Sequence, residues 1–139
     1  MSVDEISRHL GIFGLADICA RMRALDLDLF AELGTWVTES DAGQSQRWYS
    51  SACHRHAWHA ELWAERSPLI PGVDLETAVA DLRAERLPHD PDEQAYRRIL
   101  AELLADLDSI AARFDGELDP GTRRVITIIH DDVTDLINT

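Results

Sequence analysis

Positive charge is scarce in this chain of 139 residues. Lysine and arginine together number 13, against 26 aspartates and glutamates, which gives a formal net charge of −13. Proteins that bind nucleic acid neutralise its phosphates with a cationic surface, and anionic membrane surfaces also attract basic segments. The composition therefore predicts neither a nucleic-acid nor a membrane partner.

Cysteine, leader sequences and long apolar runs are also lacking. The two cysteines, Cys19 and Cys53, do not make the disulfide framework of a small secreted domain. No basic-then-apolar leader opens the chain, and no apolar stretch approaches the roughly 18 residues that a membrane span needs. We therefore expect a cytoplasmic protein.

Sustained alternation of apolar and polar residues, which is typical of strands, is absent too. Apolar or bulky side chains instead recur every three or four positions, which is typical of amphipathic helices. The four resulting seams are Leu15, Ile18, Met22, Leu25, Leu29, Leu33 and Trp36; Ala52, His56, His59 and Trp63; Leu100, Leu103, Leu107, Ile110 and Phe114; and Ile126, Ile129, Val133 and Leu136. The long helices are predicted near 12–38, 42–66, 91–115 and 119–138.

Capping signals support the starts of these helices. A capping box at Asp41 and Gln44 marks the second helix. An aspartate followed directly by proline marks the third helix at Asp90 and the fourth at Asp119.

The segment between the second and third helices is long. Residues 67–91 hold four of the five prolines, and a short helix fits between Asp74, as its N-cap, and Arg86. We expect a crossover that carries the chain from one end of a bundle to the other. Short first and last links with one long middle link are the connectivity of ferritin-like folds. We therefore predict one all-α domain over residues 1–139, a four-helix bundle with a single crossover.

The second predicted helix carries the densest group of chemically active side chains. Residues 53–63 contain three of the six histidines and two of the four tryptophans. His56 and His59 are three residues apart and so point to one side of the helix, which we take as inward. Two interpretations stay open: a pair of ligands for Fe, Mn or Zn, or two core histidines paired with neighbouring carboxylates.

Three aspartates complete the candidate metal site. Asp26 and Asp132 each lie one position off an apolar seam, where an ionised carboxylate needs a cation partner unless it turns outward to water. Asp135 is three residues after Asp132, and two nearby acids repel each other without a cation. The predicted metal ligands are therefore Asp26, His56, His59, Asp132 and Asp135. Because aspartate reaches less far than glutamate, we expect a single ion rather than a bridged pair.

Four other polar residues remain open in role. Glu102 and Asp106 could add a carboxylate from the third helix or lie on its solvated face. Cys53 precedes His56 by about one turn, where it is a small apolar residue or a ligand. His130 is a further ligand or pairs with the acids beside it.

Trp58 falls on the outer side of the second helix, opposite the two inward histidines. A large aromatic side chain on an outer face needs cover. We predict a homodimer that buries Trp58, with packing under the crossover segment as the alternative.

Two stretches, Leu29–Val37 and His56–Trp63, resemble a group of small actinobacterial ferritin-like proteins, and His130–Asp132 does so loosely. The resemblance implies a four-helix bundle with a metal site between its helices. Di-iron members of the ferritin-like class use a glutamate from each of two helices and Glu-x-x-His from each of the other two. This chain has no Glu-x-x-His, and its nearest substitutes are His56-x-x-His59 and Asp132-x-x-Asp135.

Three functions are compatible with these patterns. The first is a ferritin-like bundle that binds a divalent transition metal through His and Asp residues in its core. The second is a metal-free helical module that binds a protein partner or a small molecule without catalysis. The third is an enzyme of another bundle family that uses a His-rich metal site. The sequence contains no glycine-rich phosphate loop and no nucleophile with an oxyanion site. It therefore does not indicate nucleotide binding or hydroxyl-nucleophile catalysis.

Overall fold

The computed structural model describes residues 10–39, 43–85 and 92–139, and the regular structure in these ranges is helical throughout. The helices are α2 (Gly11–Glu39), α3 (Gly43–Arg66), α4 (Leu75–Ala84), α5 (Glu93–Arg113) and α6 (Pro120–Asn138). No strand occurs in the described ranges, so the predicted all-α class is confirmed. Every end of the four long helices lies within two residues of its predicted boundary. None of the described helices combines the length and the apolar character that a membrane crossing requires.

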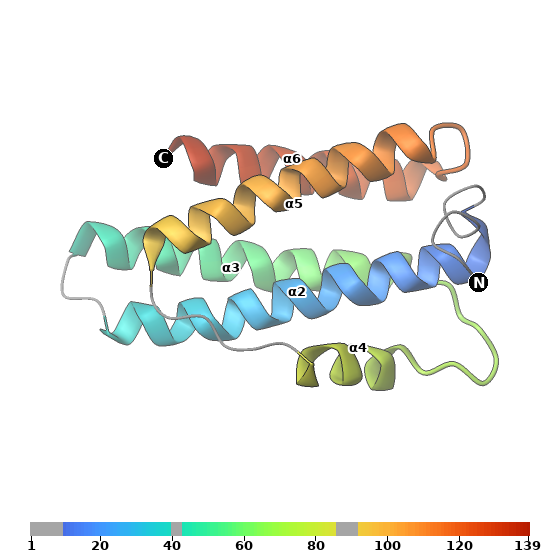
Figure 1. Cartoon of the computed structure of the whole chain (residues 1–139), viewed down its shortest axis with the longest axis horizontal. Coiled ribbons are helices and arrows are strands. Elements are labelled where there is room, and N and C mark those ends of the chain that lie inside the picture. Colours follow the sequence, from blue (N-terminus) through green and yellow to red (C-terminus); the bar gives the residue numbers. More distant parts are fainter. Residues whose placement is uncertain (1–9, 40–42, 86–91) are drawn as a thin grey trace.

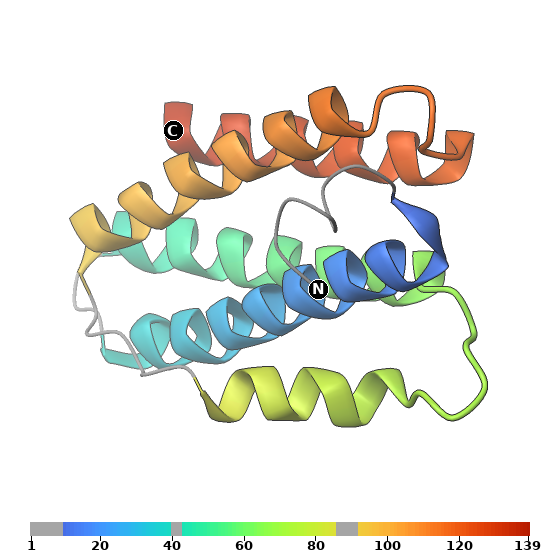
Figure 2. The same cartoon turned by 45° about the vertical axis from the view of Figure 1, so that its right-hand side comes forward.

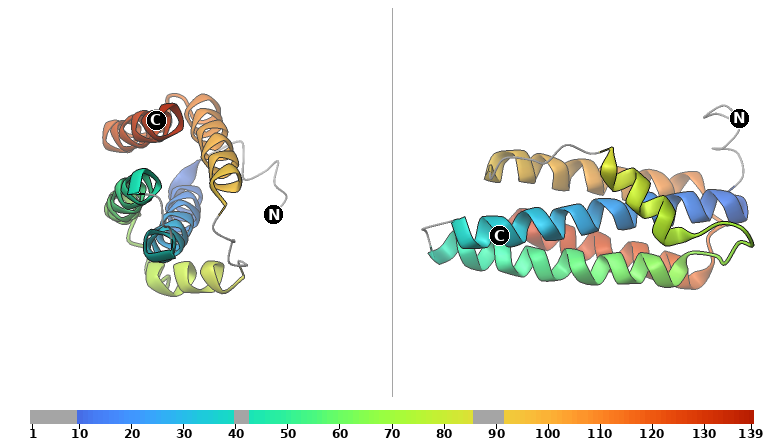
Figure 3. Two further views of the ribbon diagram at one scale, coloured as in Figure 1. Left: turned by 90° about the vertical axis from the view of Figure 1, so that its left-hand side faces the viewer. Right: turned by 90° about the horizontal axis from the view of Figure 1, so that it is seen from below.

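The long helices form two antiparallel pairs. α2 and α3 lie side by side in one pair, and α5 and α6 form the other (Figures 1 and 2). α6 also packs against α3, which joins the two pairs. α4 packs on the outer side of α2, away from α5 and α6 (Figure 3). Because α3 ends and α5 begins at opposite ends of the molecule, the segment that contains α4 returns the chain along its length.

The core forms where the predicted seams of the four long helices meet. Its deeply buried side chains include Leu29, Leu33, Ala52, His56, His59, Trp63, Leu100, Leu107, Ile129 and Val133. Burial of a leucine, isoleucine or valine side chain stabilises a fold by roughly 1.5–3 kcal/mol. A second, smaller cluster of Ala20, Ala24 and Val79 holds α4 against α2.

Aromatic rings pack together near the first turns of α3 and α5. The Tyr96 ring lies 5.3 Å from that of Trp48 and 6.1 Å from that of Trp36, both edge-on. Edge-to-face pairs of this kind stabilise beyond the area that they bury. They fix the Tyr96 ring, which is fully buried, and thereby the position of its hydroxyl.

The caps agree with the sequence at two helices and differ at one. Asp74 caps α4 and Asp119 caps α6, as predicted. α5 is capped by Asp92, which accepts a hydrogen bond from the backbone N–H of Gln94 at 2.9 Å. The predicted cap Asp90 therefore does not begin the helix. Asp92, two residues later, has an extended backbone and directly precedes the first turn of α5. Asp90 itself and the predicted cap Asp41 lie outside the described residues.

The Asp119 cap generates a prediction about stability. Its carboxylate accepts hydrogen bonds from the Thr122 hydroxyl at 2.6 Å and the Thr122 backbone N–H at 2.9 Å. Replacing Asp119 by alanine should lower the free energy of unfolding in urea by about 1 kcal/mol at pH 7. Asp115→Ala is the matched control, because Asp115 is an exposed carboxylate that makes a surface ion pair with Arg123. Equal losses in both variants would contradict the capping role.

The same cap should respond to pH. The bonds from the Thr122 hydroxyl and backbone hold the pKa of Asp119 below its ordinary value of 3.8. The unfolded chain therefore takes up the proton first as the pH falls, so the stabilisation is present above about pH 3.8 and is lost below it. The difference between wild type and Asp119→Ala should shrink between pH 7 and pH 3. A difference that stays constant would contradict this explanation.

Candidate metal centre

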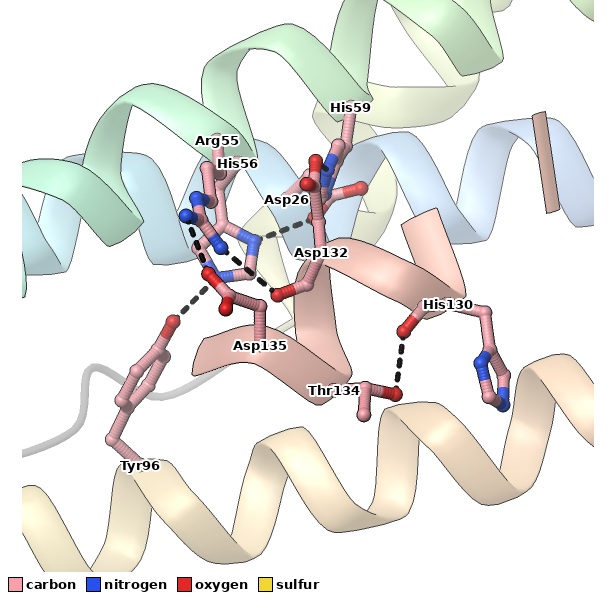
Figure 4. A network of polar contacts seen from close by, with 9 residues as sticks. All are labelled: Asp26, Arg55, His56, His59, Tyr96, His130, Asp132, Thr134 and Asp135. Atoms are coloured by element: carbon pink, nitrogen blue, oxygen red, sulfur yellow. Dashed lines mark hydrogen bonds and ion pairs between the residues drawn. The ribbon is translucent and has the colours of Figure 1, made fainter. Parts of the chain in front are cut away.

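Three of the predicted ligands meet in the core, and they come from two neighbouring helices. Asp26 projects from the middle of α2, and His56 and His59 project from successive turns of α3 (Figure 4). Asp26 is 2% exposed and both histidines are fully buried. One potential ligand atom of each lies within 4.8 Å of the other two. The alternative in which Asp26 turns outward to water is therefore wrong.

Both ring nitrogens of His56 have partners. Nδ1 lies 2.8 Å from Oδ1 of Asp26, and Nε2 lies 2.6 Å from the hydroxyl oxygen of Tyr96 (Figure 4). Burial raises the pKa of Tyr96, so this hydroxyl keeps its proton and can donate to Nε2. Nδ1 then carries the ring hydrogen and donates to the carboxylate.

His59 has a partner on one side only. Its Nε2 lies 2.7 Å from Oδ2 of Asp132 on α6, and because a carboxylate accepts, Nε2 carries the hydrogen. Its Nδ1 is buried and makes no hydrogen bond with any described residue. Burial also lowers the pKa of His59 below 6.5, against the opposing effect of Asp26 and Asp132. His59 is therefore neutral near pH 7, and a buried lone pair remains at Nδ1.

The remaining two predicted ligands lie at increasing distance from this group. Asp132 contacts Nε2 of His59 and not the buried Nδ1, and its side chain is 27% exposed. Asp135 is 61% exposed and pairs with Arg55 at 2.7 Å. Arg55 also donates to the backbone carbonyl of Asp132 at 3.1 Å, which holds this part of α6 against α3 (Figure 4). The structure thus brings together Asp26, His56 and His59, with Asp132 as a neighbour and Asp135 outside.

The polar residues of open role do not join the group. Glu102 and Asp106 are exposed on α5. His130 pairs with Asp108 at 3.0 Å at the edge of the α5–α6 pair. The Cys53 thiol donates to the backbone carbonyl of Phe30 at 3.3 Å, and burial raises its pKa. The thiol is therefore protonated and serves as a small half-buried side chain.

Two residues of the site, Tyr96 and Arg55, were not predicted from the sequence. Tyr96 lies one turn before Leu100 on the apolar seam of α5, so its inward position could have been inferred from the spacing. Arg55 follows no such pattern. Its role depends on which residues of α6 face it, and the sequence of α3 alone does not contain that information.

Comparisons with models of protein families, with curated proteins and with solved structures give no significant match. The function must therefore be inferred from the geometry of the site.

The Tyr96 hydroxyl generates a test of the network in the metal-free protein. Tyr96→Phe removes the donor to Nε2 of His56 and leaves a buried nitrogen unpaired, which should cost roughly 1–3 kcal/mol of unfolding free energy. Tyr49→Phe is the matched control, since Tyr49 is also buried in the aromatic cluster and its hydroxyl makes no hydrogen bond with a described residue. Urea unfolding measures both. If Tyr49→Phe costs as much as Tyr96→Phe, the bond to His56 does not stabilise the fold.

Proposed function

We propose that the protein is a ferritin-like bundle that binds one divalent transition-metal ion, Fe, Mn or Zn, through Asp26, His56 and His59. The observation that carries the proposal is the buried, unpartnered Nδ1 of His59 next to a carboxylate and a second imidazole. A lone pair left unpaired in a core costs free energy. A metal ion bound at this nitrogen removes that cost.

The donor set suits such an ion. Two neutral imidazoles and one carboxylate are ligands that Zn, Fe and Mn accept in proteins. Metal-bound histidines usually donate their second N–H to a carboxylate or another acceptor, which fixes the ring. Asp132 has this relation to His59, and Tyr96 has a similar place next to His56. For His56 to bind through Nδ1, its ring hydrogen moves to Nε2 and the Tyr96 hydroxyl becomes the acceptor.

One ion fits this group better than a bridged pair. Bridged dinuclear sites in ferritin-like proteins use several glutamates and two Glu-x-x-His motifs. Here the cluster has one carboxylate, Asp26, and Asp132 is engaged on the far side of His59. We therefore assign Asp132 to the orientation of His59 and leave Asp135 out of the ligand set. A bound ion would supply Lewis acidity at this position.

Two further observations support the ferritin-like assignment and the cytoplasmic location. Four long helices with one short helix in a long middle connection match the expected connectivity. Cys19 and Cys53 are both free, which suits a reducing compartment.

Metal binding should raise the melting temperature of the protein. A ligand that binds only the folded state stabilises it by about 2.7 kcal/mol at a hundredfold excess over its Kd. We expect Fe(II), Mn or Zn to shift the melting curve of wild type, and His56→Ala with His59→Ala to abolish the shift. Because that double variant could fold poorly, His59→Gln provides a milder change with the same expected loss.

His54→Gln is the matched control for this experiment, since His54 lies on the same helix but is exposed. It should retain the full shift. An unchanged wild-type curve with all three metals would contradict the proposal, and so would a shift that survives His59→Gln.

A metal-free binding module is the second candidate function. A groove of about 750 Å³ lies between α2, α4 and the residues that join α3 to α4, with mostly apolar side chains in its walls. Phe13 and Leu69 line it and are 68% and 96% exposed. Exposed apolar surface of this kind is typical of binding sites. The groove lies apart from the metal centre, so this function does not depend on a metal.

The partner that we propose for the outer face of α3 is a second copy of the chain. Trp58 is 46% exposed, so it does lie on the outer side as predicted, and no described segment covers it fully. Wild type should be a dimer by light scattering at micromolar concentration, and Trp58→Glu should be a monomer, because a charge cannot be buried unpaired in such a contact. Glu61→Ala, at another exposed position of α3, is the control and should remain dimeric. A monomeric wild type would rule out the dimer.

A further inference from the structure

A polar pocket, distinct from the apolar groove, lies close to the metal centre but is separate from it. It has a volume of about 610 Å³ and is formed by the first half of α3, the first turns of α5 and the last turns of α6. The pocket differs from the rest of the molecule in charge. Three of the 13 cationic residues of the chain, Arg47, Arg55 and Arg97, line it. Its lining also includes two carboxylate side chains, those of Glu93 and Asp135, and Thr139, the last residue of the chain.

The two carboxylate side chains leave one arginine without an ion pair. Asp135 pairs with Arg55 at 2.7 Å and Glu93 with Arg97 at 3.3 Å. Arg47 makes no ion pair with a described residue, so the side chains of the lining carry a formal charge of +1, not counting the terminal carboxylate of Thr139, in a chain whose net charge is −13. A guanidinium without an ion pair attracts anions at short range even in an acidic protein, because charges farther away are screened over about 10 Å.

The guanidinium groups of Arg55 and Arg97 are held in place with donors to spare. Arg55 donates to the backbone carbonyl of Asp132, and Arg97 donates to that of Ile137 at 2.8 Å. Arg97 also lies over the indole of Trp48, 4.6 Å from the ring centre, and the Trp48 N–H donates to the Leu136 carbonyl at 3.3 Å. Each guanidinium has five N–H donors, of which these contacts and the ion pairs use only some. The remaining donors are therefore preorganised.

We infer that this pocket binds a small oxyanion, a carboxylate or a phosphate group. Planar guanidinium groups bind such anions with two parallel hydrogen bonds, which a lysine cannot do. The hydroxyls of Ser45 and Ser51 line the same pocket and add neutral donors. All three cations that surround the space are arginines.

The pocket borders the metal centre on two sides. The Trp48 ring, one wall of the pocket, packs edge-on against Tyr96, whose hydroxyl contacts His56. Arg55, another wall, contacts the backbone of Asp132, whose carboxylate contacts His59 (Figure 4). The anion site itself does not depend on a metal, so the two sites can be tested separately.

The test is a titration of metal-free protein, treated with EDTA and followed by NMR at constant ionic strength. Inorganic phosphate and acetate are the probes. We expect saturable shifts of backbone amides near Arg47, Arg55 and Arg97 and of the Trp48 indole N–H. Saturation by phosphate at lower concentration than acetate identifies a phosphate site, and the reverse order identifies a carboxylate site.

Three variants decide whether the arginines cause the binding. Arg47→Gln and Arg97→Gln should each weaken it about tenfold or more, since each removes a charged hydrogen-bond donor. Arg98→Gln, next to Arg97 but exposed and outside the pocket lining, should bind as wild type does. Arg47 is exposed on α3, so its replacement should leave the fold intact even if Arg97→Gln does not.

Absence of saturable shifts in wild type overturns the inference, as does equal weakening in Arg98→Gln. Because the titration is done without metal, anion binding in a protein that binds no metal rejects only the metal centre. Metal binding without anion binding rejects only this pocket.

Discussion

The buried nitrogen of His59 is the constraint on which the rest of the site depends. An inward position on α3 would ordinarily hold an aliphatic side chain, and an imidazole there must find partners or lose free energy. Asp132 of α6 satisfies one nitrogen, and the adjacent His56 is held by Asp26 of α2 and Tyr96 of α5. All four long helices thus contribute to one polar network. Within this network, Nδ1 of His59 is buried and has no hydrogen-bond partner among the described residues.

Such a network is a costly way to build a core. Buried polar groups stabilise a fold only when all of them are paired, and well-packed apolar residues would often do as well or better. The apolar seams on either side, with Leu29, Leu33, Ile129 and Val133 fully buried, supply the stability that the network does not. A polar site with one unpaired buried nitrogen inside a well-packed bundle is the pattern expected where function opposes local stability. This supports a ligand at the centre over a purely structural pair of histidines.

The sequence predicted those features that depend on neighbours along the chain. The helix seams, the caps at Asp74 and Asp119, and the inward direction of His56 and His59 all follow from spacing within one helix. Contacts between helices are different, because they depend on how far each helix is shifted along its neighbour. Asp132 and Asp135 look alike in sequence, yet that shift places one against His59 and the other against Arg55. The role of Tyr96 required the same knowledge.

The metal content of the purified protein shows whether Asp26, His56 and His59 hold an ion. Elemental analysis should be made on wild-type protein purified without an affinity tag, since a histidine tag binds metal itself. We expect about one equivalent of Fe, Mn or Zn per chain in wild type, and a loss of that metal in His59→Gln but not in His54→Gln. Wild-type protein that holds no transition metal and takes up none on reconstitution would exclude a metal site at these residues, and so would a His59→Gln variant that keeps the metal.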